Sequence, residues 1–462
     1  MQLRKSYQLT DYGVGSIREV WALSWPMMIG LFSTSFQIFV ERLILSRVSV
    51  SAMNAVAHAG LVFWCLSIMV IIIAETTEFF VGKYHGAEKL KEVGRPVWQM
   101  VWFALMASPA LIGITSLVAP YIFAGTGNSQ NEIPYLTTII CFVPFFIMQF
   151  ALNGFFVGTG RTKILTYVML FGNLINGPFC YFFAIVMNMG CQGAALGTGL
   201  AWICQWAVSF LLFSKKEYRL KYGTLSWKLD FSLLKEFLRI AVPSGVAKFG
   251  ECLAHIAFYA IMARSGFENM TIVVLVQMIL ILMSFIAEGL AKGVGAVVSN
   301  LVGAKKYLLI PKAIFSAFLL HVLLTFTVTI LTFGFTDQFV RVFIAQSDLA
   351  LLSSAFFSIL TRCLVWLTLF FLLDGFCWVL FSFFLSIGDS KFVMWVNIAV
   401  HWVVYVAPVY YLVNILRLGA DMAWMTLALC NVVIFTAYLT RYFMKMRQLT
   451  TQESALESIP AA

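Results

Sequence analysis

Long apolar segments follow one another almost without interruption along the 462 residues of this chain. Each has 20 or more residues and few charges, which is the length that an α-helix needs to cross a bilayer core of about 30 Å. Short polar stretches separate the segments. The pattern predicts twelve membrane-spanning helices, at roughly residues 20–45, 52–80, 97–124, 134–156, 163–187, 191–214, 236–263, 271–299, 312–336, 350–386, 391–415 and 421–443.

The composition excludes a soluble globular protein. Of all residues, 61% are hydrophobic and 11% are charged, against about 45–50% and about 25% in soluble domains. A soluble core could not bury so much apolar surface. We therefore predict an all-α integral membrane protein.

One polar pattern occurs twice at a fixed distance. Arg18-Glu19, Pro26 and Gly86-Ala87 return 217 residues later as Lys235-Glu236, Pro243 and Gly303-Ala304. A second echo, of 160–163 at 388–391, has an offset of 228. Two copies of six spans begin on the same side of the membrane, so we predict two six-helix lobes that are parallel repeats about a pseudo-two-fold axis.

The repeat also gives domain boundaries. We expect an N-terminal lobe over residues 1–213 and a C-terminal lobe over 236–447. The polar, basic segment 214–235 between them is predicted to be a linker that meets lipid headgroups. Residues 448–462 are predicted to be a disordered tail.

Basic residues predict the orientation in the membrane. Most of the 31 lysines and arginines fall at the two termini and in the even-numbered loops. By the positive-inside rule, both termini are then cytoplasmic. This topology accounts for the formal charge of +10 and requires no nucleic-acid partner. Because residues 1–15 are polar and the first apolar run is too long for a cleaved signal, we expect no signal peptide before the first span.

The signatures of several other chemistries are missing from the sequence. The nine cysteines are scattered without a CxxC motif, and the five histidines show no HExxH spacing. There is no glycine-rich phosphate loop. We expect no cofactor, no tight metal site and an ion gradient, not ATP, as the energy source.

Ionisable residues within the apolar spans are the main candidates for function. Each costs about 2.5–3.5 kcal/mol at the bilayer centre and therefore needs a partner or a role. Lys248, Glu251 and His255 share one face of the seventh span at i, i+3 and i+7. Asp374, in the tenth span, is expected at a similar depth, because both carboxylates lie about 21–22 Å from the cytoplasmic ends of their helices.

Buried carboxylates can alternate between neutral and charged forms. Glu251 and Asp374 are therefore suited to bind and release a proton or to ligate Na⁺, and His255 to relay the proton. The alternative is structural: Lys248 neutralises Glu251, and Asp374 caps a kink near Gly375.

Polar amides in the spans are candidates for substrate contact. We select Gln149, Asn173, Asn176 and Gln277 as lining a substrate cavity, with Asn153 near Gln149. The alternative for each is a hydrogen bond between helices.

Glu75, Glu78 and Lys292 are candidates for a gate. The 217-residue offset places Glu75 at the repeat position of Lys292. We predict that this pair closes the cytoplasmic side by an ion pair between the lobes. The alternative is that both glutamates face water-filled crevices.

The sequence resembles the multidrug and toxic compound extrusion (MATE) family, and its NorM-like branch most closely, as a divergent member. The resemblance extends over nearly all twelve spans. It rests on an ordered set of segments: FQIFVERLILSRVSVSAMNAV after Pro26, VGKYHGAEKL and its repeat VSNLVGAKKY, FFVGTGRTKILTYVMLFGNLIN, AVPSGVAKFGE, and Asp374 with its 15-residue interval to Asp389.

The resemblance implies roles for particular residues. Glu251 and Asp374 match the acidic pair of the second-lobe cation site, and Asn176 matches a polar fifth-span position. Glu41 stands where the family usually has a cation-coupling aspartate. Glu41 is followed by Arg42 and lies about 30 Å along the helix from Trp21, which leaves open whether it faces the cavity or the outer interface.

The function that these features imply is secondary antiport in a bacterial inner or plasma membrane. The transporter would export amphipathic organic cations in exchange for protons or sodium, and we expect it to act as a monomer in contact with membrane lipid. A flippase for lipid-linked precursors is an alternative, but it would need several cations to hold pyrophosphate, and only Lys248 and Lys292 qualify. An integral-membrane enzyme or a channel would show a nucleophile or a pore ring that the sequence lacks.

Overall fold

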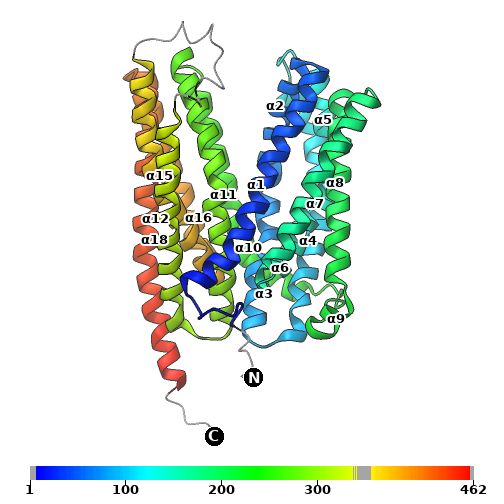
Figure 1. The fold of residues 1–462 in the computed structure, drawn as a ribbon, viewed down its shortest axis with the longest axis vertical. Helices are drawn as coiled ribbons and strands as arrows, with labels where there is room; N and C mark the ends of the chain where they lie inside the picture. Colours follow the sequence, from blue (N-terminus) through cyan, green and yellow to red (C-terminus); the bar gives the residue numbers. More distant parts are fainter. Residues whose placement is uncertain (1–6, 337, 339, 341–354, 458–462) are drawn as a thin grey trace.

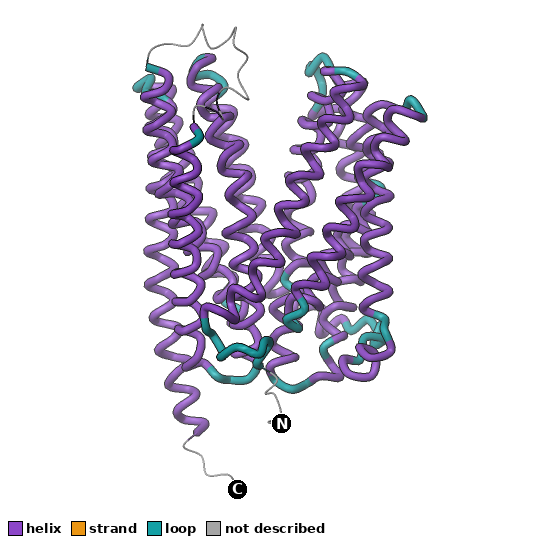
Figure 2. The backbone as a smooth tube through the Cα atoms, in the orientation of Figure 1, coloured by secondary structure: helices purple, strands orange, loops and turns teal. Residues whose placement is uncertain are grey.

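The computed structural model describes residues 7–336, 338, 340 and 355–457. All regular secondary structure in this part of the chain is helical (Figure 2). The helices form two groups that approach each other at the end of the molecule carrying both termini and diverge toward the opposite end (Figure 1). We call these two ends the terminal side and the far side.

The first half of the chain folds into six long segments. They are α1 (Ile17–Val48), α2 (Val50–Glu75) with α3 (Thr77–Gly86), α4 (Gly94–Ile122), α5 (Ser129–Ile140) with α6 (Val143–Gly158), α7 (Thr162–Tyr181) with the π-helix η2 (Phe182–Val186), and α8 (Gly190–Phe213). Short turns η1 (Leu90–Glu92) and α9 (Lys216–Tyr222) lie on the terminal side.

The second half repeats this arrangement. Its segments are α10 (Phe231–Met262), α11 (Phe267–Gly303), α12 (Ile310–Gly334) after η3 (Tyr307–Leu309), α15 (Phe356–Ile387), α16 (Ser390–Val400) with the π-helix η4 (His401–Val406), α17 (Ala407–Tyr410) and the π-helix η5 (Tyr411–Ile415), and α18 (Ala420–Glu457).

The number of spans agrees with the prediction. Among the described residues, ten helices are long and apolar enough to cross a membrane, and the pair α5 and α6, bent by 49°, forms an eleventh. Helix α10, with 32 residues and the same packing in its lobe as α1, is the twelfth. The predicted all-helical, two-lobe fold is confirmed.

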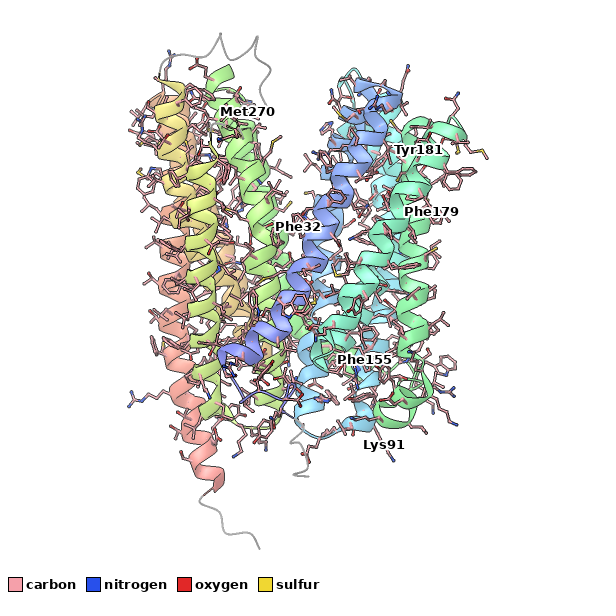
Figure 3. All side chains as sticks on the ribbon, in the orientation of Figure 1. Phe32, Lys91, Phe155, Phe179, Tyr181 and Met270 are labelled. Carbon is pink, nitrogen blue, oxygen red and sulfur yellow. The ribbon has the colours of Figure 1, made fainter. Side chains whose placement is uncertain are left out.

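The packing follows the pseudo-two-fold symmetry expected from the repeat. Helix α1 packs against α7 of its own lobe and α11 of the other, and its counterpart α10 packs against α16 and α2 in the same way. Phe32 points from α1 toward α11 (Figure 3), where its ring centroid lies 5.2 Å from that of Phe285. Pro178 and Pro408 each precede a π-helical turn, consistent with a backbone that readjusts around a missing N–H.

The C-terminal segment differs from its prediction. The prediction of a disordered tail from Gln448 is wrong over residues 448–457, because α18 continues to Glu457. The buried carboxylate of Glu453 anchors this end by accepting from the backbone N of Leu308 at 2.9 Å. Residues 458–462, and the start of the predicted span 350–386, lie outside the described residues.

The segment between the lobes packs on the first lobe. The indole of Trp98 donates to the carbonyl of Thr224 at 2.7 Å, and Gln99 donates to that of Lys228 at 2.9 Å. Both donors lie on α4. The linker is therefore held by the protein, in addition to any contact with headgroups.

Glycines let α3 and α11 cross on the terminal side. A Cβ on Gly86 would collide with the backbone of Asn300, and a Cβ on Gly303 would collide with the backbone of Lys83. These two collisions are equivalent under the 217-residue repeat. Across the same contact, His85 and Asn300 form a hydrogen bond of 2.7 Å between Nδ1 and Oδ1.

This crossing predicts a specific sensitivity to side-chain size. Gly86→Ala and Gly303→Ala should each lower the melting temperature of the purified protein, since overpacking costs about 1–3 kcal/mol. Gly60→Ala is the matched control, because a Cβ there meets nothing within 4 Å. Melting temperatures for the two crossing variants equal to that of Gly60→Ala would contradict the proposed close contact.

Candidate functional site

The second lobe contains a polar cavity of about 350 Å³. Helices α10, α11, α15 and α18, together with the α16–η4 segment, line it, and Trp64 of α2 contributes from the first lobe. Its charged and histidine lining residues are Lys248, Glu251, His255, Asp374 and His401. The structure therefore brings the predicted pair Glu251 and Asp374 to one cavity.

Lys248 occupies the carboxylate of Glu251. Its Nζ donates to both oxygens, at 2.9 and 3.0 Å. The same ammonium lies 4.0 Å from the ring centroid of Trp378, within range of a cation–π interaction. The neutralisation of Glu251 by Lys248, which the sequence left as an alternative, is present in this conformation.

Asp374 faces the same lysine from α15. Asp374, Trp378 and Phe381 share one face of this helix at i, i+4 and i+7, and all three line the cavity. The side chains of Asn431 and Trp378 lie against the Asp374 carboxyl. With one lysine and two ionised carboxylates, the cavity has a formal charge of −1 when its histidines are neutral.

Glu41 lies in the interior of the first lobe, away from this cavity. It is 6% exposed, and its Oε1 accepts from the hydroxyls of Tyr135 at 3.3 Å and Thr198 at 3.4 Å. Asn176 donates to the same Thr198 hydroxyl at 3.0 Å. Glu41 is thus a buried residue, and it belongs to one polar cluster with Asn176.

Only one of the four predicted substrate amides lines the cavity. Gln277 contributes to it from α11. Gln149 donates to Asn153 at 2.6 Å and to Ser209 at 2.8 Å. Asn173 donates to Ser33 at 2.6 Å. Together with Asn176, these two amides make hydrogen bonds within the first lobe, the alternative considered from the sequence.

A buried ion cluster joins the lobes on the terminal side. Lys292 of α11 donates to Oε1 of Glu75, and its Nζ lies 3.5 Å from Oε2 of Glu78. The side chains of these three residues are between 7% and 18% exposed. The contact that the 217-residue offset predicts is therefore formed.

Local backbone structure places the two glutamates. The helix breaks between α2 and α3, where the hydroxyls of Thr76 and Thr77 bond back to the carbonyls of Ile73 and Ala74. Such bonds compete with the helical ladder and bend it. Beside the break, Gly154 and Gly158 of α6 leave no room for a side chain against α3. These contacts fix Glu78 against α11.

A thin aromatic wall separates the cluster from the polar cavity. A second cavity of about 20 Å³ is lined by Glu75, Glu78, Glu288 and Lys292, among others. Trp378 and Phe381 line both cavities. The two groups of charges therefore lie in cavities that share the side chains of Trp378 and Phe381.

The family comparison matches the repeat. The model of the MatE family matches residues 26–182 and 243–411. The two matches begin 217 residues apart (243 − 26), which is the offset found in the sequence. The chain belongs to the MatE family. Members of this family are membrane transporters, so the chain is a multi-pass membrane transporter and not an enzyme.

Curated relatives of this MatE-family chain are bacterial. A "Probable multidrug resistance protein NorM" of Thermotoga maritima is 24% identical over 70% of this chain and 69% of its own length. A protein of the same name from Streptococcus pneumoniae is 24% identical over 52% of this chain and 55% of its own length. The "Uncharacterized transporter YisQ" of Bacillus subtilis is 23% identical over 62% of this chain and 65% of its own length.

Solved structures share the fold. One shows a multidrug resistance MATE family transporter of the MOP superfamily in an outward-facing conformation, with a TM-score of 0.85 and 19% identity, over 97% of this chain and 100% of the other. A MOP superfamily transporter of Pyrococcus furiosus, described as having reverse polarity of its binding pocket, has a TM-score of 0.86 and 18% identity over the same shares.

Sequence reasoning missed two residues of this MatE-family site. Glu288 lies one turn before Lys292 on α11, a spacing that could have identified it. His401 lines the polar cavity beside His255, but no sequence spacing links these two residues. Among the described residues, no group of three or more His, Cys, Asp or Glu side chains is placed to hold a metal ion.

The inter-lobe ion pair predicts a charge-swap rescue. Glu75→Lys and Lys292→Glu should each destabilise the protein by about 3 kcal/mol, since breaking a buried pair leaves an unpaired charge, and the double swap should recover most of the loss in melting temperature. Arg95 and Glu92, an exposed pair at 3.4 Å, provide the control, with changes expected within about 1 kcal/mol. Additive losses in the double swap would contradict the pairing.

Proposed function

We propose that this transporter exports amphipathic organic cations in exchange for protons. The observation that carries the proposal is the excess carboxylate in the polar cavity: Lys248 neutralises one of Glu251 and Asp374, and one negative charge is left among aromatic walls. Such a site suits a cation with an apolar body, because aromatic faces and a carboxylate both attract it. The names of the NorM relatives support this substrate class.

Charge and relatives support the orientation and location. Basic residues concentrate on the terminal side, so both termini are proposed to be cytoplasmic. The curated relatives are bacterial, which supports a bacterial inner or plasma membrane. The polar cavity is lined by residues of the second lobe and Trp64 of the first, and we propose that a monomer suffices for transport.

Lys248 favours the proton over sodium as the coupling ion. Sodium needs several oxygen ligands, and both oxygens of Glu251 already accept from the Lys248 ammonium. A sodium ion at this carboxylate would have to displace the Lys248 ammonium. The two cations would then remain close together, because Lys248 lies on the same helix as Glu251. A proton needs no set of oxygen ligands, so another group in the cavity can take it up.

The proposed cycle uses the inter-lobe ion cluster and the charged residues of the polar cavity. Closure of the terminal side by Lys292, Glu75 and Glu78 leaves the cavity open toward the far side, where the organic cation leaves and a proton enters. Rupture of the cluster then opens the terminal side to the cytoplasm. Exchange of one proton for one monovalent cation moves no net charge, so the pH gradient drives it: each pH unit supplies about 1.4 kcal/mol, which sustains about a tenfold gradient of the cation. One proton per cycle is sufficient.

A flippase for lipid-linked precursors is less well supported. It would need free cationic groups in the cavity for a pyrophosphate. Lys248 and Lys292 both donate to carboxylates, so neither is available to such an anion without breaking an ion pair.

The proposal predicts that transport is independent of sodium. In proteoliposomes, a lumen more acidic than the medium should drive uptake of tetraphenylphosphonium against its gradient, at equal rates with sodium or with N-methyl-D-glucamine in the buffer. We expect this result because Lys248 already binds both oxygens of Glu251, the carboxylate that a sodium ion would use. Transport that follows an imposed sodium gradient at constant pH would contradict this assignment.

The charge of Asp374 should determine affinity for the cation. Asp374→Asn should weaken tetraphenylphosphonium binding by about tenfold or more at neutral pH, since the attraction between two unit charges about 4 Å apart is about 1–4 kcal/mol from water to a surface-like dielectric. Asp374→Glu should retain part of the affinity. Glu217→Gln, on exposed α9, is the control. Equal affinities of wild type and Asp374→Asn would exclude Asp374 from the binding site.

A further inference from the structure

We infer that His255 and His401 together form the group that takes up the coupling proton in the polar cavity. This inference rests on the proposed proton antiport and deepens it by assigning the atoms that hold the proton. It adds His401, a residue outside every role discussed above. Three observations carry it: the contact between the rings, the hydrogen bond that fixes each ring, and the charge of the surrounding cavity.

The two imidazoles meet inside the cavity from different helices. Their ring centroids are 6.1 Å apart, and both rings line the polar cavity with Glu251. His255 comes from α10, whereas His401 is the first residue of the π-helix η4. A π-turn changes the direction of the side chains that follow it, and such turns are frequent at functional sites.

Hydrogen bonds to the backbone fix the tautomer of both rings. Nδ1 of His255 lies 2.9 Å from the carbonyl oxygen of Glu251, and Nδ1 of His401 lies 2.8 Å from that of Asn397. A carbonyl only accepts, so each Nδ1 must carry the hydrogen. In each neutral ring, Nε2 then holds the lone pair, and it is the atom that accepts a proton.

His321 provides an internal contrast. Its Nε2 lies 3.0 Å from the carbonyl of Phe371, so Nε2 carries the hydrogen there, and its Nδ1 is buried without a hydrogen-bond partner. This ring packs against Gly375, beside α15, and does not line the polar cavity. Burial alone therefore does not give a histidine the arrangement seen at His255 and His401.

The surroundings favour one proton on the pair. The titratable groups that face it are Lys248, Glu251 and Tyr259 from α10, Asp374 and Cys377 from α15, Cys430 and Tyr438 from α18, and Tyr405 from η4 itself. The carboxylates stabilise a first imidazolium. A second proton would place two like charges in contact, which is strongly disfavoured.

Uptake of this proton changes the charge of the cavity from −1 to 0. In the deprotonated state, the excess carboxylate attracts an organic cation. In the protonated state, the imidazolium competes with Lys248 for Glu251, and Lys248 can then turn to Asp374. Proton and organic cation therefore exclude each other from the cavity, as antiport requires.

Binding of tetraphenylphosphonium across pH tests the inference. This probe has no titratable group of its own. For wild type in nanodiscs, affinity should fall about tenfold as the pH is lowered from about 8.5 to about 5.5, with a single midpoint within this range. The double variant His255→Gln/His401→Gln should bind the probe at high pH and lose this midpoint.

Control variants separate the pair from other histidines. His58→Gln, whose ring pairs with Glu132 at 2.7 Å outside this cavity, should keep the wild-type profile. Each single variant of the pair should shift the midpoint without abolishing it, because one imidazole remains. An unchanged pH profile in the double variant would overturn the inference.

A direct measurement distinguishes failure of the pair from failure of the proposed substrate. In protein labelled with ¹³C at histidine Cε1, the resonances of His255 and His401, assigned with the single variants, should titrate together and take up one proton between about pH 5 and about pH 9. Titration without probe binding would reject the organic cation and retain the pair. Resonances that stay constant over this range would reject the pair, whatever binds.

Discussion

The close crossing of α3 and α11 is the constraint on which the arrangement of the two lobes depends. Gly86 and Gly303 allow the two backbones to touch, and the ion cluster of Lys292, Glu75 and Glu78 lies beside this contact. Such a buried ion cluster is stable only when all three members are in place, and it is strongly destabilised when one moves away. The contact is therefore suited to exist in two states, closed or separated. It holds the lobes together on the terminal side only, and the two groups of helices diverge toward the far side.

The polar cavity differs from a simple acidic cation site because it contains its own cation. Lys248 binds both oxygens of Glu251 and lies over Trp378. This leaves a single excess carboxylate, which gives the cavity the smallest net charge that still attracts a cation. Addition of one proton cancels this charge. Trp378 and Phe381 also border the inter-lobe cluster, so a change in the position of Lys248 acts on a wall shared with the gate.

Much of this architecture could be predicted from the sequence because a repeat encodes it. The offset of 217 residues places Glu75 opposite Lys292, and a pseudo-two-fold axis brings equivalent positions of α3 and α11 together. Helical spacing put Lys248, Glu251 and His255 on one face. The amides were harder to assign, because a span gives no sign of which side faces a cavity: Gln149 and Asn173 bond within their own lobe. His401 could not be linked to His255, since their contact depends on packing between helices. The continuation of α18 to Glu453 could not be predicted either, because the Glu453 carboxylate accepts from the backbone N of Leu308, which is far away in the sequence.

The most direct test of the account measures the two ends of the molecule at once. Nitroxide labels introduced as unnatural amino acids avoid the nine native cysteines. Exposed positions serve on each side: Lys91 (Figure 3) with Leu308 of η3 where the lobes meet, and Tyr121 at the end of α4 with Arg264 between α10 and α11 where they diverge. Distances from pulsed electron paramagnetic resonance should change in opposite directions when the pH is varied or tetraphenylphosphonium is added, one pair lengthening as the other shortens. Distances that stay the same at both ends under all these conditions would contradict an alternating mechanism.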